Sequence, residues 1–399
     1  MFFKKKKEVT AYAVKDSKDF SDERPVFVWL GYVYDQSLLS KVRLVFQVFL
    51  LYTAPFHHMM IIVYEDLTVD EIGLALSLTM MYILLGISWP IMMYRSKEIL
   101  QMGELLRKGY FEYFDPPTLE EKTILSKAND IIIKSRRLSI LAYFCAGLGT
   151  FIKELSPDSF RQYHMPYPGW FPFEMSSNYR FMAGFLYQLG LCVNTTAAYL
   201  SIFLLFVFYS LHFEAQFSLL IQHFRDTFPT AMSPDFVRTP ARRVWTQMRL
   251  KECVQHHLDI IDFHKQMLGF FGPTLFVFRI TCTVMLCMHC YMIMGSEIEI
   301  EELFQLVGLA FAVLYLLFIF SLKGEKVTAM SDLWSQTLYE VEWWNQPVEV
   351  QKTVLLMLVG ANRPLLIYGV WTPVLYSHRG VTAIGQETFS FLNMLRAMN

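Results

Sequence analysis

Long apolar stretches alternate with charged connecting segments along most of the chain. A helix needs roughly 20 mostly apolar residues to cross a bilayer core of about 30 Å, and six stretches approach or exceed this length. The pattern predicts an all-α fold, that of a polytopic membrane protein. The predicted spans are Leu44–Val63, Ile72–Met93, the shorter Leu138–Ile152, Phe181–Phe208, Leu268–Met294 and Leu303–Leu322.

The C-terminal part of the chain has a less regular pattern. Thr353–Ser377 is apolar enough for a span, but residues 362–364 (Asn-Arg-Pro) interrupt its middle. Val381–Met398 is long enough to cross a bilayer, but it contains Glu387 and Arg396. Hydropathy alone allows one or both of these segments to cross.

Positive charge is distributed unequally between the two sides of the predicted membrane. Three segments carry eight, nine and seven Lys or Arg: the N-terminal segment to Lys41, residues 94–137 and residues 210–265. The segments on the other side carry none, three and none: residues 64–71, 153–180 and 295–302. Lys and Arg concentrate in cytosolic loops, so the N-terminus is predicted to face the cytosol. This orientation argues against a G-protein-coupled receptor.

Acidic residues gather in the first and third external segments. Their eight carboxylates could concentrate cations at a channel mouth, or they could simply accompany the charge bias that sets orientation, and both interpretations stay open. The residues are Glu65, Asp66, Asp70 and Glu71, then Glu297, Glu299, Glu301 and Glu302.

The connecting segments also have recognisable patterns. Apolar residues at helical spacing predict a cytosolic helix at Ser96–Lys108, and Arg249–Lys265 is expected to be a polar helix that continues into the fifth span. The second external segment, rich in aromatic residues and proline around residues 163–173, predicts an ordered lid. No internal repeat is evident, which disfavours a transporter built from inverted halves.

Composition agrees with a membrane protein and gives little support to an enzyme. The chain is 54% hydrophobic and 18% charged, whereas soluble domains carry about 25% charged residues. We find no phosphate-binding glycine loop, catalytic Ser or Cys signature or zinc-protease motif. A basic stripe suited to nucleic acid is also missing. We therefore predict no catalytic residues, no metal, no cofactor and no nucleic-acid partner.

A few polar residues deserve a specific interpretation. Arg279 lies inside the fifth span, where charge is costly, and a buried partner is favoured over snorkelling of its side chain. The run at residues 287–290 (Cys-Met-His-Cys) is interpreted as packing, because no second pair of metal ligands accompanies it. Another cluster of donors is expected to form a solvated face of the polar helix: His256, His257, Asp259, Asp262 and His264.

The layout of the chain resembles that of the insect odorant receptors, inverted seven-helix proteins that form ligand-gated cation channels. The likeness is sharpest near the C-terminus. It is carried by Trp334, Tyr339, Trp343, Trp344 and Asn345, by Arg363–Leu366, and by the aromatic, Ser- and Leu-rich Thr388–Arg396. The related gustatory receptors usually finish their last helix with Gln-Phe, which is absent here, so a gustatory-type channel is the weaker alternative.

The resemblance implies that the seventh helix is split into a cytosolic anchor and a membrane-crossing pore helix. It divides the chain into residues 1–322 (six spans with the ligand pocket), residues 323–360 (anchor) and residues 361–399 (pore helix). The anchor is expected at about Ser331–Gly360 and the pore helix at about Tyr376–Met398. The pore residues implied are Asn393, Met394, Ala397 and Met398, and the subunit interface residues are Trp334, Tyr339, Trp343 and Trp344.

The resemblance also implies an odorant pocket in the outer half of the membrane. Helical spacing places a set of aromatic, Met and small residues on the faces that would line it, and Ser77 or Gln188 could supply one polar contact. Such a cavity would hold a small aromatic or heterocyclic volatile, mainly through dispersion and stacking. The set is Ser77, Met80, Met81, Phe144, Gly147, Phe151, Phe185, Gln188, Leu306, Leu309 and Val313.

The expected function is that of the odorant-binding subunit of a non-selective cation channel. The short second cytosolic loop is similar to that of odorant-selective subunits, which assemble with a shared co-receptor into a heterotetramer. The expected location is the plasma membrane of a sensory-neuron dendrite, in contact with membrane lipid. A membrane-embedded enzyme is the alternative from another class, and only the segment from His256 to His264 offers donors for one.

Overall fold

The structure is a computed structural model of the 399-residue chain. It describes residues 38–67, 69–107, most of 110–137, 165–228 except 175, 239–295, 300–371 and 375–398. The third predicted span, at residues 138–152, lies outside the described residues. The described part is almost entirely helical, with a single antiparallel bridge between Tyr368 and Leu375, so the predicted all-α fold is confirmed.

Five of the described helices are long and apolar enough to cross a membrane, and they contain the five predicted spans that can be compared. Two shorter helices, a 3-10 turn and a C-terminal helix complete the labelled set, and further helical residues occur between 119 and 137. In chain order they are α3 (Leu38–Tyr64), α4 (Val69–Tyr94), α5 (Ser96–Arg107), α8 (Asn178–Thr227), α10 (Pro240–Gly295), α11 (Ile300–Glu340), η3 (Trp343–Asn345), α12 (Val348–Ala361) and α13 (His378–Met398).

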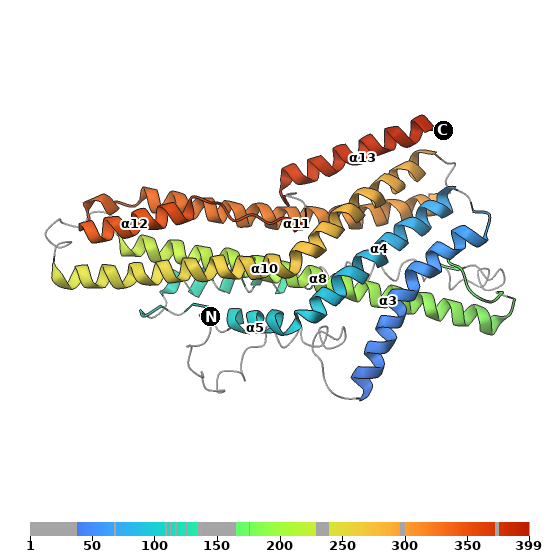
Figure 1. Ribbon diagram of the computed structural model, residues 1–399, viewed down its shortest axis with the longest axis horizontal. Coiled ribbons are helices and arrows are strands. Elements are labelled where there is room, and N and C mark those ends of the chain that lie inside the picture. The colour runs from blue at the N-terminus through green and yellow to red at the C-terminus, as the bar shows by residue number, and fades with distance from the viewer. Residues whose placement is uncertain are drawn as a thin grey trace.

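Three of these helices are much longer than a bilayer is thick. At 1.5 Å per residue, the 56 residues of α10 extend about 84 Å, and α8 has 50 residues. Figure 1 shows α8, α10 and α11 running side by side away from α3 and α4, with α12 beside their far ends. The predicted polar helix at Arg249–Lys265 is part of this extension, since α10 is one helix.

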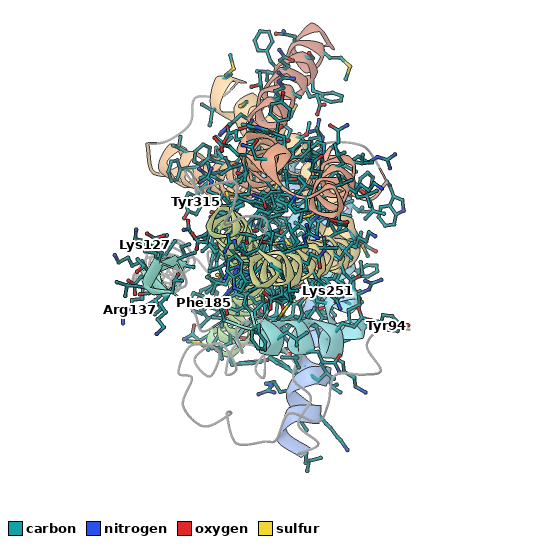
Figure 2. The ribbon with its side chains drawn as sticks, turned by 90° about the vertical axis from the view of Figure 1, so that its left-hand side faces the viewer. Tyr94, Lys127, Arg137, Phe185, Lys251 and Tyr315 are labelled. Atoms are coloured by element: carbon teal, nitrogen blue, oxygen red, sulfur yellow. The ribbon has the colours of Figure 1, made fainter. Side chains whose placement is uncertain are left out.

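Aromatic side chains fill the space between these long helices. Phe206, Phe213, Phe224 and Phe271 are all within 1% of full burial. Phe206 meets Phe271 edge to face with ring centroids 5.2 Å apart, a favourable geometry for two aromatic rings. Figure 2, which looks along the long axis, shows side chains packed densely through this bundle and Lys127 and Arg137 on a segment at its side. The bundle is therefore a continuous core.

The C-terminal region contains two separate helices, and neither is among the five that are both long and apolar enough to cross a membrane. Thr353–Ser377 is not one helix: α12 has 14 residues and ends at Ala361, which is too short to cross a bilayer. The expected anchor region, residues 323–360, is also not one helix, because α11 continues to Glu340 and α12 begins at Val348. The separate α13 has 21 residues, which is enough for one crossing.

The connector between α12 and α13 is held tightly against α10 and α11. Tyr376 donates its hydroxyl proton to the Leu275 carbonyl oxygen, at 2.5 Å, and the Val370 amide donates to the Gly272 carbonyl oxygen, at 3.3 Å. The backbone of Tyr376 passes so close to Gly324 that a Cβ there would lie 2.0 Å from its carbonyl oxygen. This close approach fixes the base of α13.

Candidate functional site

A segment on the outer side of the bundle, residues 165–174, forms the predicted lid and is pinned to α3. His57 Nδ1 donates to the Trp170 carbonyl oxygen at 2.8 Å, and the Trp170 amide donates to the His57 carbonyl oxygen at 2.8 Å. His58 Nδ1 donates to the Pro168 carbonyl oxygen at 2.7 Å. Two consecutive histidines therefore hold the lid through its backbone.

Gln188 of α8 completes this lid network. Its Oε1 accepts from the Tyr167 amide at 3.2 Å, and its Nε2 donates to the Tyr167 carbonyl oxygen at 2.9 Å. Nε2 also lies 3.2 Å from His57 Nε2, which accepts because the other ring nitrogen is the donor. A Cβ on Gly169 would lie 1.9 Å from the same His57 nitrogen. The amide predicted to contact a ligand is thus engaged by the lid.

The lid also joins two small apolar clusters that contain predicted ligand residues. Met81 packs against a cluster that includes Tyr82, and Phe185 belongs to a second cluster. Tyr167 packs against both clusters. The structure therefore brings Met81 of α4 and Phe185 of α8 to the same part of the molecule, beneath the lid.

Ser77 has a feature expected of a ligand contact. Its side chain is 1% exposed, and its hydroxyl has no hydrogen-bond partner within the described part of the chain. An unpaired buried hydroxyl is costly, and a polar atom of a ligand could satisfy it. Among the other predicted residues, Leu306 is buried and Met80, Leu309 and Val313 are half-buried. Phe144, Gly147 and Phe151 lie outside the described residues.

The predicted pore helix α13 turns one side to the bundle and leaves the other open. Ile384 and Leu392 are buried, whereas Phe389 is 64% and Met394 52% exposed. Asn393 is exposed as well. The side chains of Ala397 and Met398 lie outside the described residues, so the pore set as a whole stays a prediction.

The predicted partner of Arg279 is present, although it is half-exposed and not buried. Arg279 Nη2 of α10 lies 2.5 Å from Glu387 Oε1 of α13. The arginine side chain is 13% exposed and the glutamate 43%. The charge inside the fifth span is therefore neutralised by the one acidic residue of the C-terminal helix.

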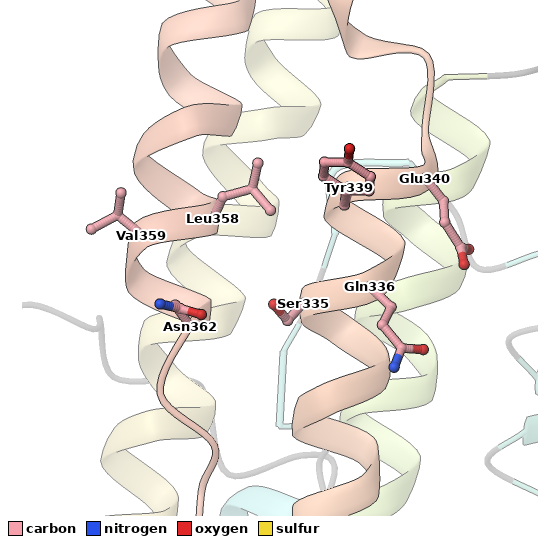
Figure 3. A pocket seen from close by; sticks show the side chains of 7 residues that line it. All are labelled: Ser335, Gln336, Tyr339, Glu340, Leu358, Val359 and Asn362. Carbon is pink, nitrogen blue, oxygen red and sulfur yellow. The ribbon is translucent and has the colours of Figure 1, made fainter.

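The far end of the bundle has a groove between α11 and α12. Its volume is about 520 Å³, and Figure 3 shows Ser335 and Tyr339 of α11 turned toward α12, with Gln336 and Glu340 on the side of α11 that is turned away. The remaining lining residues are Leu358, Val359 and Asn362. Tyr339 is 72% exposed and is available to another chain.

The three predicted interface tryptophans differ in exposure. Trp344 in η3 is 52% exposed, and Trp343 beside it is half-buried. Trp334 is 0% exposed, and its ring meets Phe224 of its own chain edge to face at 5.3 Å. The structure therefore corrects the position of Trp334, which is a core residue with no surface left for a partner.

A polar cluster in the long bundle was not expected from the sequence. The Tyr113 hydroxyl donates to His256 Nδ1 at 2.6 Å, and His256 Nε2 donates to Gln216 Oε1 at 3.0 Å. His223 Nε2 lies 3.2 Å from Glu252 Oε2. The partners come from α8, α10 and the segment after α5, so no local pattern could have revealed them.

The predicted solvated face of α10 is accordingly wrong. His256, His257 and His264 are buried, and only Asp262 of the acidic pair is exposed. Burial lowers the pKa of His256 to about 3, with a further contribution from His223. Charged imidazoles would be poorly solvated there, so His256 is neutral at pH 7. Within the described residues no group of His, Cys, Asp or Glu is arranged to hold a metal ion.

Comparisons with known proteins agree with this arrangement. The family model described as 7tm Odorant receptor matches residues 68–375. The chain is 26% identical over 249 residues to Odorant receptor 13a of Drosophila melanogaster, a match over 58% of this chain and 57% of that protein. The chain thus spans little more than half the length of that curated relative.

Two solved structures share the fold over nearly the whole chain. The insect olfactory receptor OR5 from Machilis hrabei matches with a TM-score of 0.75 over 95% of this chain and 98% of its own, at 11% identity. The same receptor in complex with eugenol matches with a TM-score of 0.74 over 94% and 97%. At this identity the likeness concerns the fold.

Proposed function

The chain belongs to the insect odorant receptor family, and from that premise we propose that it is the odorant-binding subunit of a ligand-gated, non-selective cation channel. The observation that carries the proposal is the family match over residues 68–375, which extends through α4, α8, α10, α11 and α12 to the base of α13. Members of this family are receptors, so the membrane-enzyme alternative is set aside.

The ligand is proposed to be a small aromatic or heterocyclic volatile. The buried aromatic and Met side chains around Tyr167 favour flat apolar molecules, which gain dispersion and stacking energy there. The unpaired hydroxyl of Ser77 supports one polar contact. Eugenol, the ligand of the relative with the same fold, is an aromatic volatile with oxygen substituents and is a suitable first probe.

The channel is proposed to be a heterotetramer with the family's co-receptor, in the plasma membrane of a sensory-neuron dendrite. In this assembly α12 and the end of α11 form the anchor, and the exposed side of α13 contributes to the pore. The exposed Tyr339 and Trp344 support the first assignment and the exposed Phe389 and Met394 the second.

The test is to co-express the chain with the co-receptor, apply a panel of aromatic volatiles that includes eugenol, and record whole-cell current. We expect inward cation current that requires both subunits. No odorant-evoked current across a broad panel, in cells that respond to a co-receptor agonist and show this chain at the surface, would contradict the proposal.

A substitution on α4 tests the ligand position. Ser77→Ala should raise the concentration of an oxygen-bearing odorant for half-maximal response by about five- to tenfold, because a net hydrogen bond contributes about 1 kcal/mol. Ser88→Ala is the matched control: Ser88 is also fully buried on α4 with an unpartnered hydroxyl among the described residues, but it lies three turns further along. Equal responses of the two variants would place the ligand elsewhere.

A further inference from the structure

The ion pair between Arg279 and Glu387 joins the helix at the centre of the bundle to the helix at its edge. α10 packs against both α4 and α13, and Figure 1 shows its C-terminal part between these two helices. The close contact of Gly73 with Met288 and Met292 lies at the first of these surfaces. α4 also carries Ser77, so α10 lies between the proposed ligand position and the proposed pore helix.

The attachment of α13 is uneven along its length. Its base is fixed by the buried Tyr376, whose hydroxyl bonds to Leu275 of α10, and by the His378 amide, which donates to Glu325 Oε2 of α11 at 3.4 Å. Beyond the base, apolar contacts of Ile384 and Leu392 remain. Figure 1 shows α13 at the edge of the molecule, with the C-terminal part of α10 as its neighbour.

Glu387 is well placed to act on this partly free length of helix. It lies nine residues after the start of α13, about 14 Å along the axis at 1.5 Å per residue. The bond to Arg279 is short, at 2.5 Å, and charge-assisted. Apolar side chains can slide past one another, whereas this contact is directional and ties one point of α13 to one point of α10.

The apolar surroundings of Arg279 strengthen the ion pair as long as the two charges remain in contact. Arg279 is 13% exposed within an apolar helix segment, and charges attract most strongly where water is excluded. A free arginine there would be poorly solvated, although Glu387 itself is 43% exposed. A displacement of α10 therefore draws Glu387 with it, because following costs less than separating the charges.

We propose that the Arg279–Glu387 ion pair couples the movement of α10 to α13, so that ligand binding beside α4 and α10 is transmitted to the pore. Both residues are positioning residues: neither touches the ligand or needs to touch the permeating ion. The inference rests on the proposed function and adds to it the contact through which this chain acts on the pore.

The experiment measures odorant-evoked current for Glu387→Gln, Arg279→Gln and the exchanged pair Arg279→Glu/Glu387→Arg, each co-expressed with the co-receptor. Current evoked by a co-receptor agonist in the same cells normalises for channel number. In each single variant the normalised maximal odorant current should be at least tenfold lower than in the wild-type chain. The exchanged pair should recover most of this current. Arg379→Gln, which removes an exposed charge near the base of the same helix, should behave as the wild-type chain.

Other outcomes overturn the inference. Normal odorant current in both single variants, or an exchanged pair as defective as the singles, would show that the pair does not couple the helices. A rise in current without odorant would mean that the pair holds the channel closed. A shifted reversal potential with normal gating would assign it to ion selectivity. A wild-type chain without odorant current overturns the proposed function and this inference together, whereas currents equal in wild type and singles overturn the inference alone.

Discussion

The long bundle of α8, α10 and α11 and the C-terminal helix α13 use apolar residues in opposite ways. Between the bundle helices, large side chains are enclosed by the chain itself: Trp334 and Phe224 are both 0% exposed. In α13, the side chains of Phe389 and Met394 are 64% and 52% exposed. A single chain thus completes the core of the bundle, but it leaves α13, like Phe311 and Tyr339 on the outside of α11, with apolar surface that lipid or another subunit must cover.

Polar groups show the same contrast. In the bundle His256 has hydrogen-bond partners on both ring nitrogens, so the network fixes three segments relative to one another. In α13 the side-chain contact with α10 is the ion pair of Glu387 with Arg279, and a backbone amide at the first residue donates to Glu325 of α11. The difference indicates a rigid frame and a helix that can change position, and the following variants test it.

The largest effect is expected from Trp334→Ala. Removal of a fully buried Trp leaves a cavity and typically costs about 3–5 kcal/mol, so the thermal midpoint in detergent should fall sharply and little monodisperse protein should be recovered. Phe389→Ala on α13 is the control and should change stability by about 0.5 kcal/mol or less. Trp334→Phe, which keeps most of the apolar volume, should lie between them. Equal losses for Trp334→Ala and Phe389→Ala would contradict the contrast.

A second, smaller effect concerns pH and the histidines of the bundle. The folded-state pKa of His256 is about 3 because of burial, whereas an unfolded histidine titrates near 6.5. Between these two pH values the unfolded chain binds more protons than the folded chain. The contribution of His256 to the free energy of unfolding is therefore fully present above pH 6.5 and is lost as the pH falls toward 3. At pH 5 one such histidine lowers the free energy of unfolding by about 2 kcal/mol.

The thermal midpoint of the wild-type chain should therefore fall between pH 7 and pH 5. His256→Gln removes one titrating group from the bundle and should flatten this dependence, even if its stability at pH 7 is lower. His378→Gln, at the exposed start of α13, should leave the slope unchanged. Identical slopes for the two variants would show that His256 titrates normally.

Sequence and structure agree best where one local property decides the outcome. Apolar runs the length of a bilayer identify α3, α4 and α8, because each must be covered by lipid or protein along its whole length. Asn362 to Pro364 marks the end of α12 for a similar reason, since proline disfavours helix at the preceding residue. The family resemblance, carried by residues near the C-terminus, is confirmed by the match over residues 68–375.

The sequence is less informative where distant segments meet. His256 lies in a polar stretch, and it is buried because Phe111 stacks on it at 4.6 Å and Tyr113 bonds to it. Trp334 was predicted to lie at a subunit interface, but Phe224 of α8 packs against it and its side chain is buried. Arg279 was different: a charge in an apolar helix demands a partner, so the need was predictable although the identity of Glu387 was not.

The smallest effect on stability is expected at the far end of the bundle, where Tyr339 lines the groove between α11 and α12 and Trp344 lies in the adjacent turn η3. The same variants separate folding from assembly most clearly. Tyr339→Ala and Trp344→Ala remove aromatic side chains that are 72% and 52% exposed, so each should change the thermal midpoint of the isolated chain little, by about 0.5 kcal/mol or less. Buried aromatic residues dominate the energy of many interfaces, and the double variant should therefore reduce co-purification with the co-receptor severalfold. Tyr94→Ala, which alters an aromatic residue 89% exposed outside the groove, controls for loss of exposed aromatic surface. Normal co-purification of the double variant would leave the groove without a role in assembly and would mean that the exposed side of α13 is the surface covered by the neighbouring subunit.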